Sequence, residues 1–286
     1  MTGKIPLKAA AEPGGSLISS AKLQQLYLAM LHCRMLTQHP RQQRRRFQNL
    51  IGQEALITGW MIDLLPQDTL AAAAMDDIAS LIKGVPLPEI AARLFVRRRL
   101  ALPELGDQLS AATADAAAHR RKKNGNVVVV FAGAPATDLA SWSGALKQAA
   151  RRRLPMVFVV ENNPWVTPPR LKTMLQEEAI TQSARRYGLP AITVDGNDVV
   201  AVYRVACESL ERVRQGDGPV LVEGKTYRAA GRRTSRADRD PLLHMERYLA
   251  AKKLFTPKWK TQLRKTFAQE LAAATKAIPS RAKSEA

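Results

Sequence analysis

The chain has 286 residues, and its 44 lysines and arginines outnumber its 25 aspartates and glutamates, which gives a formal net charge of +19. With 46% hydrophobic and 24% charged residues, the composition is typical of a globular protein and excludes a collagen-like or intrinsically disordered chain. A chain of this length buries about three quarters of its unfolded surface, so it needs no disulfide or metal ion to fold.

The two cysteines, Cys33 and Cys207, lie far apart and in no spacing typical of metal ligands, which predicts two buried thiols in a reducing compartment. No apolar run approaches the length of a membrane span, and the polar residues 1–20 lack the hydrophobic segment of a signal peptide. We therefore expect a cytoplasmic protein that has no membrane partner.

Three helices are expected in the first hundred residues. The first begins after a capping serine, Ser19 or Ser20, and runs to about Thr37. The second is expected over residues 53–65, where Pro66 ends it, and the third over residues 88–98. One stripe of the first helix is predicted to be buried, because its apolar residues recur at helical spacing: Leu23, Leu26, Tyr27, Met30, Leu31 and Met35.

The middle of the chain alternates between strands and helices. Continuous apolar runs at residues 126–131, 156–160, 191–194 and 220–223 indicate strands that are covered on both faces, as in parallel sheets. Helical segments are expected between and after them, over residues 138–152, 174–187, 198–214, 241–253 and 258–278. This order predicts an α/β fold with a doubly wound, mostly parallel sheet and helices on both faces.

The chain shows no internal repeat and no low-complexity linker. We expect a flexible N-terminus over residues 1–18, a single domain over residues 19–278 with helical extensions at both ends, and a flexible tail over residues 279–286. Length alone would also allow two domains.

Ligands of an open parallel sheet bind beyond the carboxyl ends of its strands. The loops after Phe131, Val160 and Val194 are therefore the places where a site is expected. Neither of the first two loops has the glycine spacing and the lysine of a phosphate-binding P-loop.

Six short motifs together carry a resemblance to a known family. The sequence resembles the alpha subunit of thiamine-diphosphate-dependent 2-oxo acid dehydrogenases, the first component of the pyruvate and branched-chain complexes, from about Leu23 to Phe255. The resemblance implies a thiamine-diphosphate-binding fold, oxidative decarboxylation of a 2-oxo acid, and a beta subunit that completes the active site in a two-alpha, two-beta tetramer. The motifs are Gly52-Gln53-Glu54-Ala55, Lys83-Gly84-Val85-Pro86-Leu87, Val159-Val160-Glu161-Asn162-Asn163, Val194-Asp195-Gly196-Asn197-Asp198, Thr226-Tyr227-Arg228 and Arg239-Asp240-Pro241.

The position of the family's metal ligand is changed. Gly133-Ala134-Pro135 corresponds to the family's Gly-Asp-Gly segment, so Ala134 stands where an aspartate would hold the magnesium ion of the cofactor. Asn163 still occupies the family's asparagine position, and the resemblance leaves Gly133 and Asn163 as weak candidates for cofactor binding. Magnesium prefers carboxylate and phosphate oxygens, so we expect no metal site. Asp138, one helical turn downstream, is expected to be a helix N-cap.

Other family positions differ as well. Ala74-Met75 replaces the Tyr-Arg pair that contacts the diphosphate, and Asp77 replaces a histidine. The family's glycine-rich loop has no counterpart between residues 97 and 108. The active-site histidine position is Arg232, and an arginine cannot exchange a proton near neutral pH, so no catalytic residue is expected. The four histidines of the chain are expected on the surface or in packing: His32, His39, His119 and His244.

Basic residues cluster at positions 44–46, 97–99, 120–123, 151–153 and 232–239. Because these clusters are dispersed over several helix ends and lack interleaved aromatic residues, a solvated structural role is favoured over nucleic-acid binding. Arg232, Arg233 and Arg236 replace the histidine loop at the expected cofactor mouth. We expect them to bind an acidic segment of a partner or a small anion.

The preferred interpretation is an alpha-subunit-like protein that is impaired or inactive in thiamine diphosphate binding and acts as a structural or regulatory subunit. Its expected partner is a beta-subunit-like protein or a second copy of the chain. The first alternative is an active oxidative decarboxylase with rearranged cofactor ligands, supported by Asn163 and residues 52–55. The second alternative is a basic nucleic-acid-binding protein.

Overall fold

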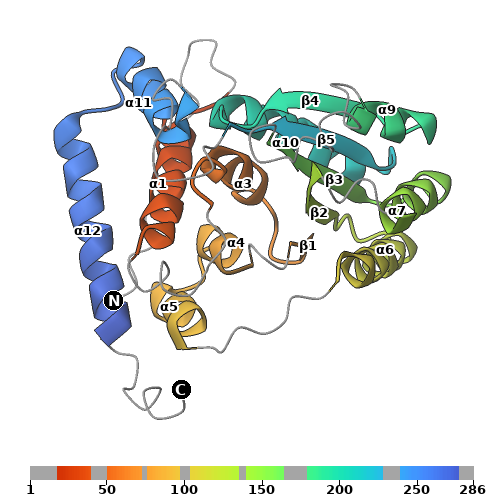
Figure 1. Ribbon diagram of the computed structural model, residues 1–286, viewed down its shortest axis with the longest axis horizontal. Helices are drawn as coiled ribbons and strands as arrows, with labels where there is room; N and C mark the ends of the chain where they lie inside the picture. The colour runs from red at the N-terminus through yellow and green to blue at the C-terminus, as the bar shows by residue number, and fades with distance from the viewer. Residues whose placement is uncertain are drawn as a thin grey trace.

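The computed structural model describes residues 18–39, 50–72, 76–96, 104–134, 140–163, 179–227 and 239–276. Figure 1 shows a parallel sheet flanked by helices, with a helical layer at one end. The helices and strands, in chain order, are α1 (Ser20–Thr37), α3 (Glu54–Met61), β1 (Thr69–Ala71), α4 (Asp76–Ile82), α5 (Leu87–Val96), α6 (Leu105–Lys122), β2 (Val128–Gly133), α7 (Ala140–Arg151), β3 (Met156–Asn162), α9 (Ala179–Arg186), β4 (Ala191–Asp195), α10 (Val199–Arg214), β5 (Val220–Lys225), α11 (Pro241–Ala251) and α12 (Pro257–Lys276).

The sheet has five strands in the order β1-β2-β3-β5-β4, and each neighbouring pair is parallel. The predicted doubly wound parallel sheet with helices on both faces is therefore confirmed. The four predicted strands are also confirmed, although β2, β3 and β5 each extend two residues further than their apolar runs. The sequence did not indicate β1, which has three half-buried residues and pairs with β2 from Thr69 opposite Val128.

Alternate residues of the central strands fill two separate apolar cores, one on each face of the sheet. One core lies beneath α6, α7 and α9 and includes Trp142 and Phe158, whose rings meet edge to face with centroids 5.4 Å apart. The other lies beneath α3, α4, α5 and α10 and includes Trp60. Because both faces are covered, the strands carry continuous apolar runs.

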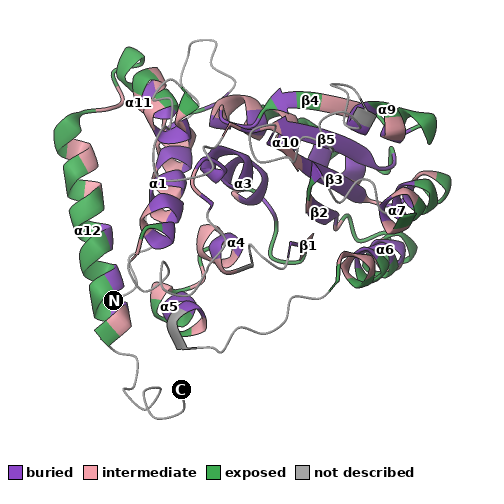
Figure 2. Cartoon of the chain, in the orientation of Figure 1, coloured by how far each residue is buried: buried purple, intermediate pink, exposed green. Residues whose placement is uncertain are grey.

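A third apolar cluster joins α1, α11 and α12 (Figure 1). The predicted stripe of α1 is buried here except for Met35, which is only half-buried. Figure 2 shows the contrast between the buried strands and the largely exposed outer side of α12. This layer packs against α3, α5 and α10, which in turn cover one face of the sheet.

Local signals explain most of the helix boundaries. Ser19 caps α1 as predicted, because its side chain accepts a hydrogen bond from the Lys22 amide. Asp198 caps α10 and Asp240 caps α11 in the same way. The predicted extension of the second helix to residue 65 is wrong: α3 ends at Met61, because Asp68 draws the Leu65 amide into a turn and Pro66 disfavours helical backbone before it.

Several helix ends fall outside the described residues, including the predicted segments 97–98, 138–139, 174–178 and 277–278. The helices α4 and α6 were not predicted; α6 buries mainly alanines, such as Ala112 and Ala116, and so has no stripe of large apolar residues. The expected burial of both cysteines holds for Cys33 only, since Cys207 is half-buried. Within the described residues, no helix combines the length and the apolar character needed to cross a bilayer.

Candidate functional site

The strand ends that the sequence singled out lie together at the carboxyl edge of the sheet. Gly133 is the last residue of β2 and pairs with Glu161 of β3, so Ala134 and Asn163 follow neighbouring strand ends. Gly133 is exposed, whereas Ala134 and Asn163 are buried. The register therefore brings together the two positions that the family resemblance assigns to magnesium binding.

The side chain of Ala134 belongs to the apolar core beneath α6 and α7. It is 1% exposed and lies in the same cluster as Leu109 and Trp142. A carboxylate at this position would have to leave the cluster or be buried in it, and burying an unpaired charge is costly. The structure thus gives the substituted position an apolar packing role.

The nearby carboxylates already accept hydrogen bonds from protein groups. Glu223 accepts from the Asn162 side chain at 2.6 Å and from the Thr193 hydroxyl at 3.1 Å, and its side chain is buried. Glu161 accepts from the Thr226 hydroxyl at 2.9 Å. Within the residues that the structure describes, no group of three or more histidine, cysteine, aspartate or glutamate side chains is arranged to hold a metal ion. The described part of this edge does not fit magnesium, which needs oxygen ligands such as carboxylates together with the phosphates.

Hydrogen bonds also tie the strand ends to one another. The Thr226 amide donates to the Asn162 carbonyl oxygen at 2.9 Å, which links β5 to β3. Asn197, after β4, accepts from the Tyr227 amide at 2.7 Å and donates to the Gly52 carbonyl oxygen at 3.0 Å. The turn before α3 is thereby held against the carboxyl edge.

One buried side chain at this turn lacks protein partners. Gln53 is 1% exposed, and neither its amide nitrogen nor its amide oxygen has a hydrogen-bond partner in the described structure. It precedes α3 without capping it. Buried amides are normally paired, so Gln53 is a group that a ligand or a partner protein could satisfy. Gln53 belongs to one of the six motifs, but no sequence signal distinguishes it from the other residues of that motif.

A buried network of ion pairs lies behind the same turn. Arg34 of α1 binds Glu54 at the start of α3, and it donates to both carboxylate oxygens of Asp240 at 3.0 and 3.3 Å. Glu54 also accepts from the Gly52 amide at 2.8 Å. This arginine joins two of the quoted motifs, residues 52–55 and 239–241, which are far apart in the sequence.

Burial sets the protonation behaviour of this network. Burial raises the pKa of Glu54, and the ion pair with Arg34 offsets that rise only in part. Burial alone would lower the pKa of Arg34, but Glu54 and Asp240 outweigh it and hold the pKa above its usual value. The arginine therefore stays charged, and the network cannot lose one partner without leaving another unpaired.

Several predicted site residues lie outside the described residues. They are Ala74, Met75, Asp138, Arg232, Arg233 and Arg236. Asp77, which stands at a family histidine position, lies in α4 and is half-buried. The described residues that flank the arginine-containing segment are in contact, because the Arg239 guanidinium stacks over the Tyr227 ring at 4.5 Å from its centroid.

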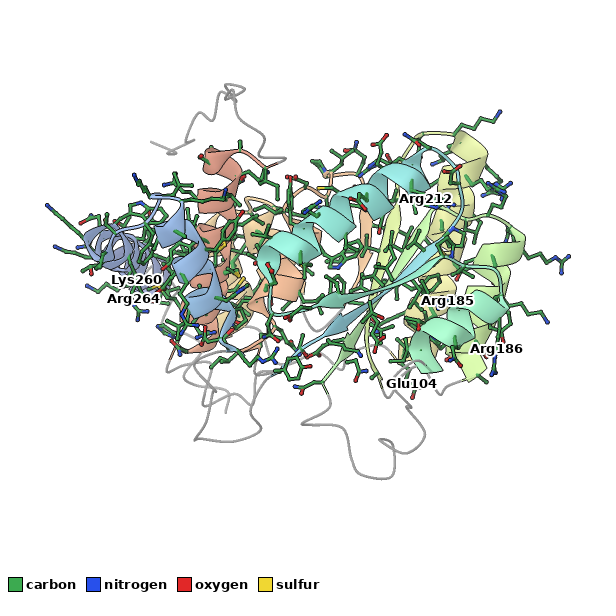
Figure 3. The ribbon with its side chains drawn as sticks, turned by 90° about the horizontal axis from the view of Figure 1, so that it is seen from above. Glu104, Arg185, Arg186, Arg212, Lys260 and Arg264 are labelled. Carbon is green, nitrogen blue, oxygen red and sulfur yellow. The ribbon has the colours of Figure 1, made fainter. Side chains whose placement is uncertain are left out.

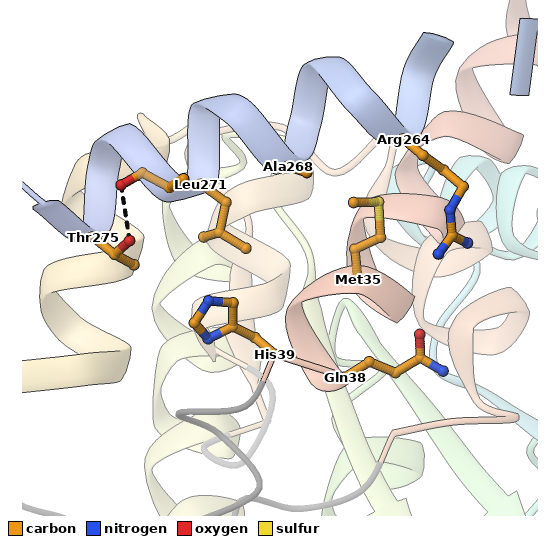
Figure 4. A pocket seen from close by; sticks show the side chains of 8 residues that line it. Met35, Gln38, His39, Arg264, Ala268, Leu271 and Thr275 are labelled. Carbon is orange, nitrogen blue, oxygen red and sulfur yellow. Dashed lines mark hydrogen bonds between the residues drawn. The ribbon is translucent and has the colours of Figure 1, made fainter. Parts of the chain in front are cut away.

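A pocket of about 390 Å³ lies away from this edge, between the carboxyl end of α1 and α12 (Figure 4). Its lining includes Met35, His39, Arg264 and Leu271. No residue that sequence analysis assigned to a site lines it.

Comparison with known families settles the relationship. The family model described as "Dehydrogenase E1 component" matches residues 101–286, which is more than half of the chain. The chain belongs to the dehydrogenase E1 family. The resemblance inferred from the six motifs is thus confirmed, and the parallel sheet flanked by helices agrees with it.

Individual family members are similar over part of their length. The pyruvate dehydrogenase E1 component subunit alpha of Porphyra purpurea is 33% identical over 218 residues, which are 67% of this chain and 63% of that protein. The chloroplastic subunit alpha-3 of Oryza sativa subsp. japonica is 29% identical over 72% of this chain and 58% of that protein. The 3-methyl-2-oxobutanoate dehydrogenase subunit alpha of Mycobacterium tuberculosis is 40% identical over 124 residues, 43% of this chain and 34% of that protein. The chain spans about 60% of the length of the first two relatives.

Proposed function

We propose that this dehydrogenase E1 family member is an alpha-subunit-like protein that does not bind thiamine diphosphate through magnesium, and that it acts as a structural or regulatory subunit. The observation that carries the proposal is Ala134. Its methyl group is packed in the apolar core at the position where the family resemblance expects the metal-binding aspartate.

The surrounding carboxylates support this proposal. Glu161 and Glu223 are the acidic residues nearest to the ends of β3 and β5, and both accept hydrogen bonds from side chains. These hydrogen bonds fix the orientation of both carboxylates within the fold, so neither could turn toward a metal ion without giving up a bond. Removal of a group that merely orients a metal ligand costs about 10- to 100-fold in affinity, so loss of the anionic ligand itself should cost at least as much.

We further propose that the chain forms a single domain over residues 19–278, resides in the cytoplasm, and assembles with a beta-like protein or a second copy of itself. Support for a partner comes from the relatives, which are named as subunits of the pyruvate dehydrogenase E1 component.

Calorimetric titration with thiamine diphosphate and Mg²⁺ tests the proposal. We expect no binding at micromolar cofactor, both for the chain alone and for the chain mixed with a beta-subunit-like partner. Micromolar binding with a stoichiometry near one would overturn it. A parallel titration of the Ala134→Asp variant asks whether restoring the carboxylate raises Mg²⁺-dependent affinity; its thermal denaturation shows whether the added charge is tolerated in the core.

An active decarboxylase with rearranged ligands is the second candidate. Two observations favour it: an asparagine, Asn163, follows β3 at the family's asparagine position, and the buried Gln53 amide has no hydrogen-bond partner among the described residues. This candidate predicts cofactor binding that weakens when Gln53→Leu is introduced. It also predicts release of CO₂ from a 2-oxo acid when the beta-like partner is added.

A further inference from the structure

Four basic clusters that are separated in the sequence meet at the amino edge of the sheet. They lie at the carboxyl ends of α6, α7, α9 and α10, and each of these helices precedes a strand that begins at this edge. Because all strand pairs are parallel, this edge is opposite the one that holds Ala134 and Asn163. The expectation that the basic clusters are dispersed therefore does not hold for residues 120–123 and 151–153, which meet here with the basic residues at the ends of α9 and α10.

Hydrogen bonds between the helix ends establish their proximity. Arg214, at the end of α10, donates to the Gly125 carbonyl oxygen beyond α6 at 2.8 Å. Arg153, beyond α7, donates to the Gly216 carbonyl oxygen beyond α10 at 3.4 Å. The end of α9 adjoins them, since β4 and β5 begin side by side. In Figure 3, Arg185, Arg186 and Arg212 lie on the side of the molecule away from Lys260 and Arg264 of α12.

We call this surface the amino-edge patch. Its four segments, residues 119–126, 150–155, 184–191 and 210–219, contain eleven arginines and lysines but only two acidic residues, an excess of nine in a chain whose net charge is +19. About half of the net charge is therefore gathered here. Its basic residues, all exposed except Arg214, are Arg120, Arg121, Lys122, Lys123, Arg151, Arg152, Arg153, Arg185, Arg186, Arg212 and Arg214.

The fold itself does not require so many cations at this edge. A helix carboxyl end carries about half a negative charge, so four ends offset roughly two of the eleven positive charges. Among the described residues, two members of the patch pair with carboxylates: Arg214 with Asp68, and Arg212 with Asp217 at 3.7 Å. Most of the charge thus remains available to a partner.

The chemistry of the patch favours nucleic acid over protein. Protein interfaces have an apolar centre depleted in charge, whereas nucleic-acid interfaces are more polar and strongly positive. The large apolar side chains exposed in the described structure, Leu65 and Tyr187, lie at opposite ends of this edge, near β1 and β4. The basic residues at the carboxyl ends of α6, α7 and α10 lie between them. Arginine is also well suited to paired hydrogen bonds with phosphate.

We propose that the amino-edge patch binds the phosphate backbone of a nucleic acid, independently of base sequence. Strands lie about 4.8 Å apart, so the three intervals from β2 to β4 span roughly 14 Å. A duplex carries one charge per about 1.7 Å, which places about eight phosphates along that distance. The excess of nine positive charges matches this number.

Fluorescence anisotropy with labelled 20-nucleotide single-stranded and duplex DNA of mixed sequence tests the proposal on the full chain. The edge variant combines Arg121→Gln, Arg151→Gln, Arg152→Gln and Arg186→Gln, which are exposed side chains at three helix ends. We expect wild-type binding at 50 mM salt and at least tenfold weaker binding by the edge variant. The slope of log affinity against log salt should become about four units shallower, one unit for each lost phosphate contact.

A matched control removes the same charge from α11 and α12 through Arg247→Gln, Lys258→Gln, Lys265→Gln and Lys276→Gln. We expect it to bind DNA within about twofold of wild type. Equal losses in the two variants would overturn the proposal, because binding would then follow net charge alone. Circular dichroism must show that both variants fold. If the edge variant does not fold, the slope of log affinity against log salt for the wild-type chain is the test. A slope steeper than about −4 supports binding at the patch, and a shallower slope contradicts it.

Two competitors identify the kind of polyanion. Polyglutamate at equal charge concentration represents an acidic protein segment, and vesicles containing phosphatidylserine represent a membrane surface. If either competitor displaces labelled DNA as effectively as unlabelled DNA does, the proposal that the patch binds nucleic acid is wrong. The test is independent of the proposed function, because it uses no cofactor and addresses the opposite edge of the sheet.

Discussion

The two edges of the parallel sheet differ in charge and in how their polar groups are used. At the carboxyl edge, Ala134 is packed in the core and the carboxylates of Glu161 and Glu223 accept hydrogen bonds from neighbouring side chains. At the amino edge, basic side chains project into solvent from four helix ends. The difference teaches that the described polar groups of one edge are bonded within the fold, whereas most of those at the other edge face solvent.

Each edge is also stabilised by an arginine that pairs with an aspartate; Arg34 is buried, whereas Arg214 is half-buried. Arg34 forms ion pairs with Glu54 and Asp240 near the carboxyl edge, and Arg214 forms an ion pair with Asp68 at the amino edge. Substituting each arginine tests whether the two sets of ion pairs contribute equally to the free energy of unfolding.

The largest effect is expected for Arg34→Met. This change leaves the buried Glu54 without its cation, so we expect the free energy of unfolding to fall by about 3–5 kcal/mol in urea denaturation. The double variant Arg34→Met/Glu54→Gln removes the stranded charge and should recover at least half of the loss. No recovery would mean that Arg34 acts mainly through Asp240.

A smaller loss is expected for Arg214→Leu at the other edge. Asp68 becomes unpaired, but it keeps hydrogen bonds from the Leu65 amide at 2.8 Å and the Val127 amide at 3.0 Å. We expect a loss of about 2 kcal/mol, again from urea denaturation. A loss as large as that of Arg34→Met would remove the proposed difference between the two sets of ion pairs.

The stability of the packing between α1 and α12 should depend on pH through His32 of α1. Its ring stacks on Phe267 at 3.9 Å and borders Leu28, Ile62 and Leu81, and burial lowers its pKa to about 4. The unfolded chain therefore binds the proton first as pH falls, so the stability from neutral His32 is present above about pH 6.5 and is lost toward pH 4.

We expect this group to reduce the free energy of unfolding by about 2 kcal/mol between pH 7 and pH 5. His32→Phe should remove that part of the pH dependence, measured by urea denaturation at both values. Carboxylates titrate in both proteins, so the comparison isolates His32. Identical pH dependence in the two proteins would contradict the assignment.

The smallest effect is expected for Gln53→Leu. The Gln53 amide has no hydrogen-bond partner in the described structure, so replacing it removes the cost of burying an unpaired polar group. The free energy of unfolding should therefore stay within about 1 kcal/mol of wild type or increase. Thermal denaturation measures this, with Gln53→Glu as a destabilising control. A clear loss of stability would indicate that Gln53 is satisfied by a group that the described structure lacks.

Strands were easier to predict from the sequence than helices. Four apolar runs located β2, β3, β4 and β5, because burial on both faces requires continuous apolar side chains. The short β1 carries no such run, since its residues are half-buried at the edge of the sheet. The helix α6 was not predicted, because its buried face consists mainly of alanines and lacks the large apolar residues that mark an amphipathic helix.

The site could be predicted only in part. The resemblance located Ala134 and Asn163, and parallel pairing explains why they meet. The Arg34 network could not be predicted, because its partners lie 20 and 206 residues away and arginine occurs within an otherwise apolar stripe. Likewise, the basic clusters looked dispersed until the strand order brought the helix ends together.

The close contact between α3 and β5 gives Gly224 a wider influence than its size suggests. A Cβ atom on this residue would come within 2.5 Å of Cδ1 of Leu56, so the Leu56 side chain of α3 lies directly on the strand backbone. An alanine at position 224 would force Leu56 to change its conformation or α3 to shift. A shift of α3 would displace Glu54, two residues before Leu56, relative to Arg34.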